Sequence, residues 1–504
     1  MNLKCTFLGE RKTRGPRAVR SPNERLELVC RIELEHLCAV DTMHRIIADF
    51  STFIYPLFPL VHLPSLRTAL EAEAYRRDAA FLRRCFALSA ITVACMPSNM
   101  SEYGGRLYDT VQSMVDRASA LVSMSRVSED PAWQDIPSMD AMIDSTFLCI
   151  GMHYSGRPNT GWSFCNETMV SCSSLQVHRK ETHARLNHLD SELCKRVFWV
   201  LYSFRCFDRF VSVTPHTLLA FPPDDTDWEY LHLAETTDEE LSQMLHEPQS
   251  THSPASSAPH TPLISGFIAY IALFQRLRQI SSIPISCRSP YGLFPHGYPP
   301  DHICDNYPAA ANETLPAHIT NHLKAIGEMR RRFEAATLDL PLELRVPGPS
   351  RISALEPLAS EFHIARANIH ITSLYIQSVL LENVIHVQLL PALPSARPDE
   401  EGSSTLDTQT EMLLKCELWK YRSGIAQDLL SVLEHIPKET LERNSFAFVL
   451  AIRKVASTLL DPDGDMAIPD SMKEGVMSES YVQQFAEILA PLDCNAPLSL
   501  RDGD

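Results

Sequence analysis

Apolar side chains recur at every third or fourth position over long stretches of this chain, and this helical period limits its fold more than any other feature. In the clearest stretch, residues 191–213, one wide apolar face is formed by Leu193, Val197, Val200, Leu201, Phe204, Phe207 and Val211. Asp190 or Ser191 can cap this helix, and Glu192 lies four residues before Arg196, a spacing that suits an ion pair. The same spacing predicts helices over 23–50, 65–75, 79–94, 105–123, 139–153, 160–175, 263–280, 317–338, 353–390, 409–436, 445–460 and 478–489. Because no convincing alternating stretch or internal repeat accompanies them, the sequence predicts an all-α fold.

Proline-rich and serine-rich segments divide this helical pattern. We expect a basic arm over 1–22, a first helical half over 23–245, and a second helical half over 263–490. The segment between them, 246–262 (HEPQSTHSPASSAPHTP), has too few apolar groups to fold alone and predicts a disordered linker. Irregular Pro-rich loops are expected over 281–316 and around 391–402, and residues 491–504 form a tail.

The motifs of several enzyme classes are missing from the sequence. It contains no G-x-S-x-G, no G-x-G-x-x-G and no G-x-x-x-x-G-K-[ST], and its 17 glycines are few for 504 residues. An acidic stretch, Asp461–Asp465, has its glycine at the wrong place for a calcium loop. We therefore predict that the chain is not an enzyme. No secretory signal and no long apolar run is present, so no membrane span is expected, and the scattered cysteines suit a reduced, intracellular protein.

Charge is distributed unevenly along the chain. The whole sequence has a net charge of −17, yet residues 1–20 hold six basic residues against Glu10 alone. Such an arm on an acidic body suits a protein that touches nucleic acid through its N-terminus only, and the alternative is a solvated, disordered leader. Contacts to the phosphate backbone would be independent of sequence and sensitive to salt. The residues predicted to make them are Lys4, Arg11, Lys12, Arg14 and Arg17.

The N-terminal residues Leu3–Leu8, followed by the basic run with Arg14-Gly15-Pro16, resemble the end of the six-cysteine binuclear zinc cluster of fungal transcription regulators. The resemblance implies that Cys5 is the sixth thiolate ligand and that the other five would lie upstream of Met1. A single cysteine cannot hold two zinc ions, so zinc is expected only if an upstream cluster exists. Either the start site lies too far downstream, or the module has been lost and the protein pairs with other regulators.

A longer resemblance covers residues 45–230, with a looser helical match to about 490. The segment Asp49–Pro64 (DFSTFIYPLFPLVHLP) is similar to the start of the fungal-specific transcription factor regulatory domain. Leu175–Arg179 matches a step of that domain with Gln176 in place of glycine, and Arg196–Phe198 with Trp199 matches its aromatic helix. Phe221–Asp227 resembles its acidic, Pro-containing ending. The order of these segments implies an all-helical regulatory domain.

Three charged residues interrupt the apolar helix over 191–213. Arg205 and Asp208 are spaced to pair at i, i+3, with Arg209 beside them, because an unpaired charge in an apolar environment is costly. A structural ion pair is the main prediction and a ligand-sensing role is the alternative. Trp199, Tyr202, Phe204 and Phe207 are predicted to be core aromatics.

The combined hypothesis is a nuclear transcription regulator that controls a metabolic or biosynthetic gene set. DNA binding by this chain would be weak or indirect, and its other partners would be fellow regulators, a second copy of itself, or a small-molecule effector. The alternative is a helical ligand-binding or scaffold protein without direct DNA binding. A helical enzyme is a third interpretation.

Overall fold

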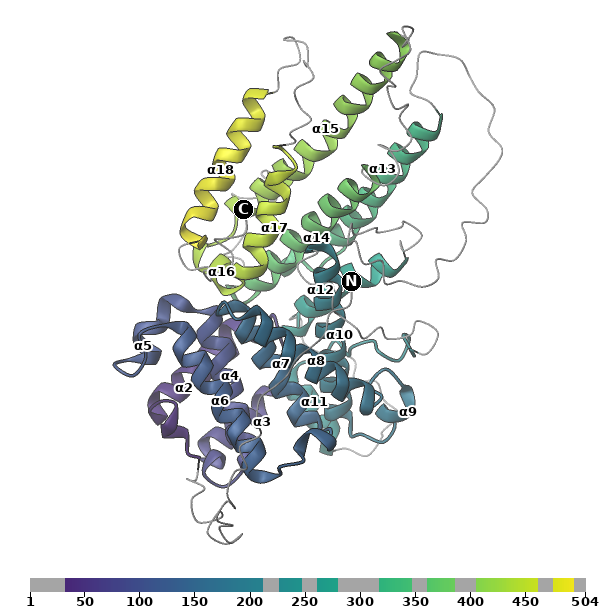
Figure 1. Ribbon diagram of the computed structural model, residues 1–504. Coiled ribbons are helices and arrows are strands. Elements are labelled where there is room, and N and C mark those ends of the chain that lie inside the picture. Colours follow the sequence, from purple (N-terminus) through teal and green to yellow (C-terminus); the bar gives the residue numbers. More distant parts are fainter. Residues whose placement is uncertain are drawn as a thin grey trace, which may run out of the picture.

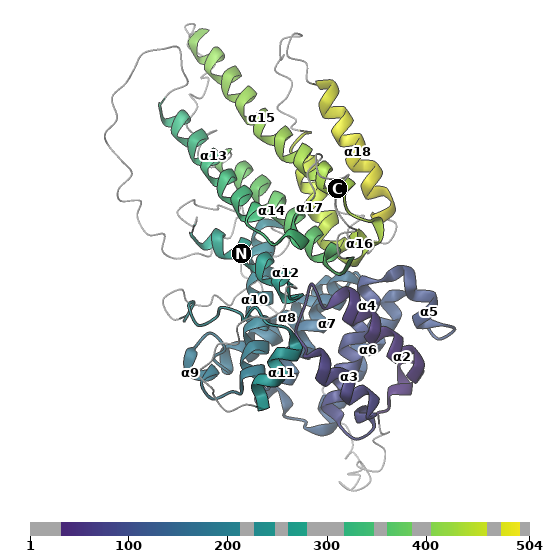
Figure 2. The same ribbon diagram turned by 180° about the vertical axis from the view of Figure 1, so that it is seen from behind.

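Every regular element in the described part of the chain is a helix, which confirms the predicted all-α class. The computed structural model describes residues 32–211, 226–246, 261–279, 317–346, 360–385, 405–460 and 475–493. The basic arm and most of the predicted 246–262 linker lie outside these residues. Figures 1 and 2 show two bodies of helices, with α2 to α11 in the lower one and α13 to α18 in the upper one.

The chain enters the lower body through a broken helical segment. A short turn, η1 (Leu34–His36), is followed by α2 (Val40–Asp49), which continues into a π-helical turn, η2 (Phe50–Ile54). The expected single helix over 23–50 is therefore wrong within its described part, because Ala39 is extended and α2 starts only after it. Beyond Tyr55 the chain is irregular, as Pro56 and Pro59 require, until α3 (Leu63–Glu71) and the turn η3 (Ala74–Arg76).

Four long helices make the centre of the lower body. They are α4 (Ala79–Cys95), α6 (Val111–Glu129), α7 (Met139–Tyr154) and α8 (Pro158–Ser174). Asp78, Thr110 and Ser138 cap the first three, each through a side-chain oxygen that accepts from a first-turn backbone N–H. The short elements η4 (Pro97–Asn99), α5 (Met100–Gly104) and η5 (Trp133–Asp135) connect them. Most residues of α4 and α7 are buried, so these two helices contribute a large part of the core of the lower body.

The lower body is completed by α9 (Lys180–His183), α10 (His188–Val211) and α11 (Asp238–His246). The next helix, α12 (Ile264–Gln279), contacts both α10 and α14 and lies between the two bodies. In the upper body the central helix is α14 (His363–Val384), which contacts α12, α13, α15 and α17. Around it lie α13 (Ala317–Leu338), η7 (Leu342–Leu344), η8 (Ser360–Phe362), α15 (Thr405–Glu434), α16 (Lys438–Arg443), α17 (Ser445–Ser457) and α18 (Gly475–Asp493).

The last two residues of α16 and Asn444, which follows them, fasten the upper body to the lower one, and we call residues 442–444 the α16–α17 loop. Glu442 accepts hydrogen bonds from the backbone N–H and the hydroxyl of Ser98, both at 2.9 Å. Asn444 accepts from the Tyr154 hydroxyl at the end of α7, and the Arg443 guanidinium lies 4.7 Å from the centre of the Phe53 ring. The two bodies therefore share a polar and aromatic junction as well as the α12 contacts.

Among the described helices, none is by itself long and apolar enough to cross a membrane. One pair, Ala79–Cys95 with Pro97–Gly104, meets the length and composition criteria only when taken together, across a bend of 105°.

Candidate functional site

Helix α10 organises the part of the lower body in which the family-like sequence segments meet. It begins at His188, where the Asn187 side chain accepts from the backbone N–H of Asp190 at 2.8 Å. This residue, and not the expected Asp190 or Ser191, therefore caps the helix. The apolar face predicted from the sequence points into the core, because Leu193, Val197 and Val200 are all buried.

Helix α10 also carries a fully buried arginine, Arg196. The Arg196 side chain is 1% exposed, and both terminal nitrogens lie 3.5 Å from Oδ1 of Asp238, at the start of α11. Nη1 also donates to the Pro59 carbonyl at 3.0 Å and approaches the Tyr55 hydroxyl at 3.5 Å. Burial raises the pKa of Tyr55 well above its ordinary value, so that the hydroxyl stays protonated.

The Asp238 carboxylate and backbone extend this contact to the Pro-rich segment. Oδ2 accepts from the backbone N–H of Leu63 at 2.9 Å. The His62 ring accepts from Ser65 N–H at Nδ1 and therefore donates from Nε2 to the Asp238 carbonyl, at 2.8 Å. We call Tyr55, Pro59, His62, Arg196 and Asp238 the Arg196 node. It joins α10, α11 and the PLFPLVHLP segment through buried hydrogen bonds, which is a positioning role and not a reactive one.

Four aromatic rings pack beside the node. Phe198, Trp199 and Tyr202 come from α10, and Trp228 comes from the segment that precedes α11. The Trp228 ring centroid lies 5.9 Å from Phe198, 6.1 Å from Trp199 and 5.6 Å from Tyr202. The Trp199 indole donates to the Leu231 carbonyl at 2.8 Å, which satisfies its buried N–H. The core role predicted for Trp199 and Tyr202 is confirmed, and Phe204 and Phe207 also pack against the core.

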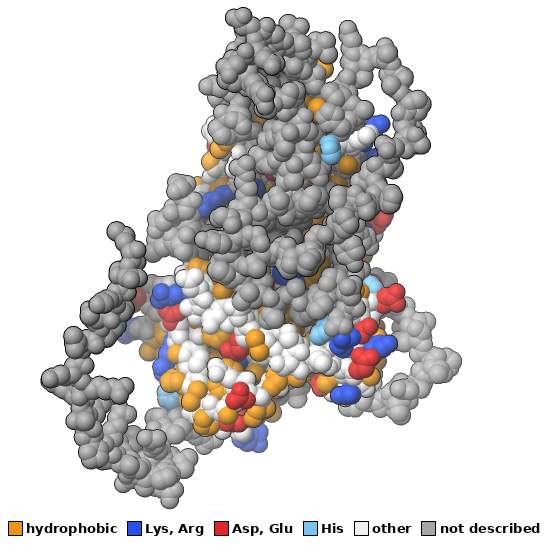
Figure 3. All heavy atoms as spheres, turned by 45° about the vertical axis from the view of Figure 1, so that its right-hand side comes forward, with side chains coloured by type: hydrophobic (Ala, Val, Ile, Leu, Met, Phe, Trp, Pro, Cys, Tyr) orange, Lys and Arg blue, Asp and Glu red, His pale blue; other side chains and the backbone are white. Residues whose placement is uncertain are grey.

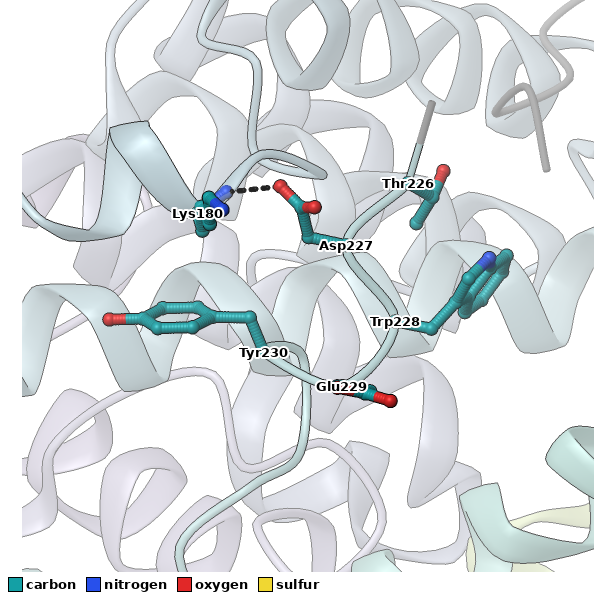
Figure 4. Close-up of a pocket in the computed structure, with 6 residues that line it drawn as sticks. All are labelled: Lys180, Thr226, Asp227, Trp228, Glu229 and Tyr230. Atoms are coloured by element: carbon teal, nitrogen blue, oxygen red, sulfur yellow. Dashed lines mark hydrogen bonds between the residues drawn. The ribbon is translucent and has the colours of Figure 1, made fainter. Parts of the chain in front are cut away.

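A surface cavity of about 530 Å³ opens next to this aromatic cluster (Figure 4). Its lining residues are Lys180, Thr226, Asp227, Trp228, Glu229 and Tyr230. Asp227 holds one wall in place, because its carboxylate accepts from the backbone N–H of Lys180 at 2.9 Å. The Lys195 ammonium lies 5.2 Å from the centre of the Tyr230 ring and so connects the cavity to α10. A second hollow of about 300 Å³ lies between α2 and α3.

The described surface carries both signs of charge. On the face drawn in Figure 3, acidic and basic side chains of the lower body lie next to one another among apolar ones. Within the described residues, no group of three or more His, Cys, Asp or Glu side chains could hold a metal ion. The described cysteines are free thiols, and burial raises the pKa of several of them, including Cys85 and Cys172.

The predicted site residues have different outcomes. Cys5, Lys4, Arg11, Lys12, Arg14 and Arg17 lie outside the described residues, so their roles stay predictions. Arg205 is a half-buried residue of α10, but the side chains of Asp208 and Arg209 are outside the described part, so the predicted pair is also untested. One local expectation is wrong. Glu192 does not pair with Arg196 four residues on, but with Lys195 at 2.7 Å.

Sequence reasoning missed the buried pair of Arg196 and Asp238 and the bridging role of His62. Local spacing gave no signal for the Arg196–Asp238 pair, because the two residues lie 42 positions apart. Asp238 also begins an acidic run of the kind that is typical of an exposed helix start. A signal did exist in Arg196 itself, since a cation on an apolar helix face requires a buried partner.

Comparison with known proteins relates this region to a family. Residues 47–288 match the family model described as the fungal specific transcription factor domain. Searches of curated proteins and of solved structures found no match. The matched range runs from α2 through α12 and includes the Arg196 node, the aromatic cluster and the cavity. It supports a fungal-specific transcription factor domain over these residues, in a family of transcription regulators that is not enzymatic.

Proposed function

We propose that this protein is a transcription regulator of the fungal zinc-cluster type that controls a metabolic or biosynthetic gene set. The observation that carries the proposal is the family match over residues 47–288, on an all-helical fold. Two of the family-like segments, Asp49–Pro64 and the helix that carries Arg196, also meet at the Arg196 node although they are far apart in sequence. In this proposal the helical body receives a signal or a partner and performs no chemistry of its own.

The basic arm is the proposed contact to DNA. Lys4, Arg11, Lys12, Arg14 and Arg17 would bind phosphates, and Cys5 would be one thiolate ligand of a zinc cluster. Cys5 alone cannot hold zinc, so DNA binding by these 504 residues would be weak or would depend on another regulator. The protein would act in the nucleus, alone as a homodimer or together with such a regulator. The cavity beside Trp228 is a candidate position for a small-molecule effector.

A gel-shift experiment with the full chain tests the DNA contact. A plot of log affinity against log salt concentration has a negative slope, to which each phosphate contact contributes about 0.9. Alanine at the five arm positions should therefore make this slope shallower by about 4.5. A matched control removes five exposed basic residues of the body, Arg45, Arg76, Arg331, Arg332 and Lys420. That variant should keep the salt dependence. If both variants lost the same amount of salt dependence, the arm would not be the contact to DNA.

Deletion of the gene tests the regulatory role. The proposal expects a coherent set of transcripts to change and a tagged protein to accumulate in the nucleus. Unchanged transcripts together with a diffuse cytoplasmic signal would instead support the helical ligand-binding or scaffold protein without direct DNA binding.

A further inference from the structure

A line of polar side chains runs along the buried central helix of the upper body. Arg366, His370, Ser373 and Gln377 follow one another at i, i+4, i+7 and i+11 on α14, and so lie on one face of it. We call these four residues the α14 stripe. Arg366, Ser373 and Gln377 are buried, whereas His370 is partly exposed. Polar groups in such a position need partners, because burial removes them from water.

The cation at one end of the stripe has few partners. Arg366 is 3% exposed, and burial lowers its pKa. Its Nη2 donates to the Glu343 carbonyl at 2.5 Å, but its Nε has no hydrogen-bond partner. Within the described residues no carboxylate forms an ion pair with it. Arg366 contacts the backbone carbonyl of Glu343, whereas the Glu343 carboxylate accepts from the Thr261 hydroxyl at 3.0 Å.

The same end of the stripe holds the turn η7 against α14. Arg366 donates to the carbonyl of Glu343, and His370 Nε2 donates to that of Leu344 at 3.0 Å. The packing is close here, since a Cβ on Gly266 of α12 would lie 2.5 Å from the Ala365 side chain. The turn is therefore fixed by a buried cation whose only described acceptor is an uncharged carbonyl oxygen.

The other end of the stripe has an unused acceptor. Gln377 donates from Nε2 to the Ser373 hydroxyl at 3.3 Å, and its Oε1 has no hydrogen-bond partner. Eleven residues of helix separate it from Arg366, which corresponds to about 16 Å. The stripe thus presents an unsatisfied N–H at one end and an unsatisfied carbonyl oxygen at the other.

We propose that the α14 stripe binds a small organic monocarboxylate, whose carboxylate pairs with Arg366 in place of the η7 carbonyls. A charge-assisted bond from guanidinium to carboxylate is shorter and stronger than one to a neutral carbonyl, so the ligand competes well for Arg366. Because Arg366 supplies one of the two bonds from the stripe to η7, occupation removes that bond and loosens the turn.

The charge of the stripe favours a singly charged ligand. His370 is neutral at pH 7, because burial lowers its pKa to about 4, so Arg366 supplies the single positive charge. The stripe lies outside the family-matched residues 47–288 and does not depend on the proposed function. Ligand binding to the α14 stripe is measured on purified protein. A negative result in that experiment would therefore leave the gel-shift and gene-deletion experiments unaffected.

Thermal unfolding of the full chain tests the proposal with butanoate and 3-hydroxybutanoate as probes. Uncharged butanamide and inorganic phosphate are the comparison ligands, and sodium chloride keeps ionic strength constant. We expect a saturable rise in Tm of about 2 °C or more with the two carboxylates and a smaller one with phosphate. Arg366→Met should abolish this rise. The control Arg422→Met removes a different guanidinium that pairs with Glu382 of α14 at 2.7 Å, and it should keep the rise.

A second readout is proteolysis within residues 339–346, which should accelerate when a carboxylate is bound. The proposal is overturned if no carboxylate raises Tm, if butanamide or phosphate raises it equally, or if Arg366→Met retains the effect. Should Arg366→Met fail to fold, Arg366→Lys decides the question. Lysine keeps the charge but not the fork of donors, so affinity should fall by about tenfold, and unchanged affinity would overturn the proposal.

Discussion

The Arg196 guanidinium relies on Asp238 for its countercharge. Asp238→Ala would leave this buried cation without a carboxylate among the described residues and would also free the Leu63 N–H. We expect the free energy of unfolding to fall by about 3 kcal/mol, measured by urea titration with circular dichroism. The control Glu334→Ala removes a 45% exposed carboxylate from Arg330 and should cost less than about 1 kcal/mol. Equal losses in the two variants would contradict the role assigned to the node.

Gln176 occupies a backbone conformation that suits glycine. Its φ is +53°, directly after α8, and the backbone N–H of Val177 donates to the Cys172 carbonyl at 3.1 Å to close the helix end. Gln176→Gly should therefore raise the free energy of unfolding by about 1 kcal/mol. Ser174→Gly, two residues earlier within α8, should lower it by about 0.5–1 kcal/mol. If both substitutions destabilise the protein, the strain at Gln176 is not the deciding effect.

The His370 imidazole makes stability depend on pH. Burial lowers its pKa to about 4, from an ordinary value of 6.5. Between these values the unfolded chain binds the proton more tightly, so stability is present above pH 6.5 and is lost as pH falls towards 4. The loss is up to about 3 kcal/mol. His370→Gln keeps a donor for the Leu344 carbonyl and should remove this loss from the plot of unfolding free energy against pH, measured by urea titration. Parallel plots for the variant and the original protein would contradict the lowered pKa of His370.

Residues of the site were predictable from the sequence only where one side chain carries its own signal. Trp199 is a core residue, as its sequence position predicts, because a large aromatic group on an apolar helix face is strongly favoured to be buried. The partner of Arg196 could not be chosen in this way. Glu192 has suitable local spacing, but the fold brings Asp238 to the guanidinium and leaves Glu192 to Lys195.

At the level of elements, close packing of α4 against α7 depends on Gly151. A Cβ at this position would lie 3.0 Å from the backbone carbonyl atoms of Ala90, which cannot move without shifting α4. Gly151→Ala should therefore lower the free energy of unfolding by about 1–3 kcal/mol in spite of the better helix propensity of alanine. In the control Gly327→Ala the nearest atom is the Tyr421 hydroxyl, the end of a flexible side chain, at 3.2 Å. Urea titration should therefore give a higher free energy of unfolding for Gly327→Ala than for Gly151→Ala.

Helix length decided which elements could be predicted. The long periodic helices α4, α10 and α13 lie where the apolar spacing predicts them, with α13 spanning Ala317–Leu338. The short helices α9, α11 and α16 were not predicted, because four to nine residues hold too few turns for a periodic signal. The expected helix over 105–123 begins only at Val111, since Gly105 has a φ of +55° and Thr110 forms the cap.

Across the whole molecule, one continuous apolar core passes from the family-matched residues into the upper body. Phe207 of α10 stacks on Tyr375 of α14, with ring centroids 5.6 Å apart, and it lies at the same distance from Phe274 of α12. The second attachment, the α16–α17 loop, is polar and aromatic. Because one attachment is apolar and the other depends on hydrogen bonds, the loop is where the coupling of the two bodies can be altered without opening the core.

Asn444 is the residue of that loop that contacts both bodies. It accepts from the Tyr154 hydroxyl of α7 and donates to Asn368 of α14 at 2.9 Å, and it is itself buried. Asn444→Ala leaves the buried Asn368 and the half-buried Tyr154 hydroxyl without this partner, which should lower the free energy of unfolding in urea titration by about 2 kcal/mol. Hydrogen exchange should accelerate in α16, α17 and the end of α7, and stay unchanged in α3. Ser457→Ala, at the exposed end of α17, should alter neither measurement. Faster exchange in α3 as well would mean that Asn444 supports the whole fold and not the junction alone.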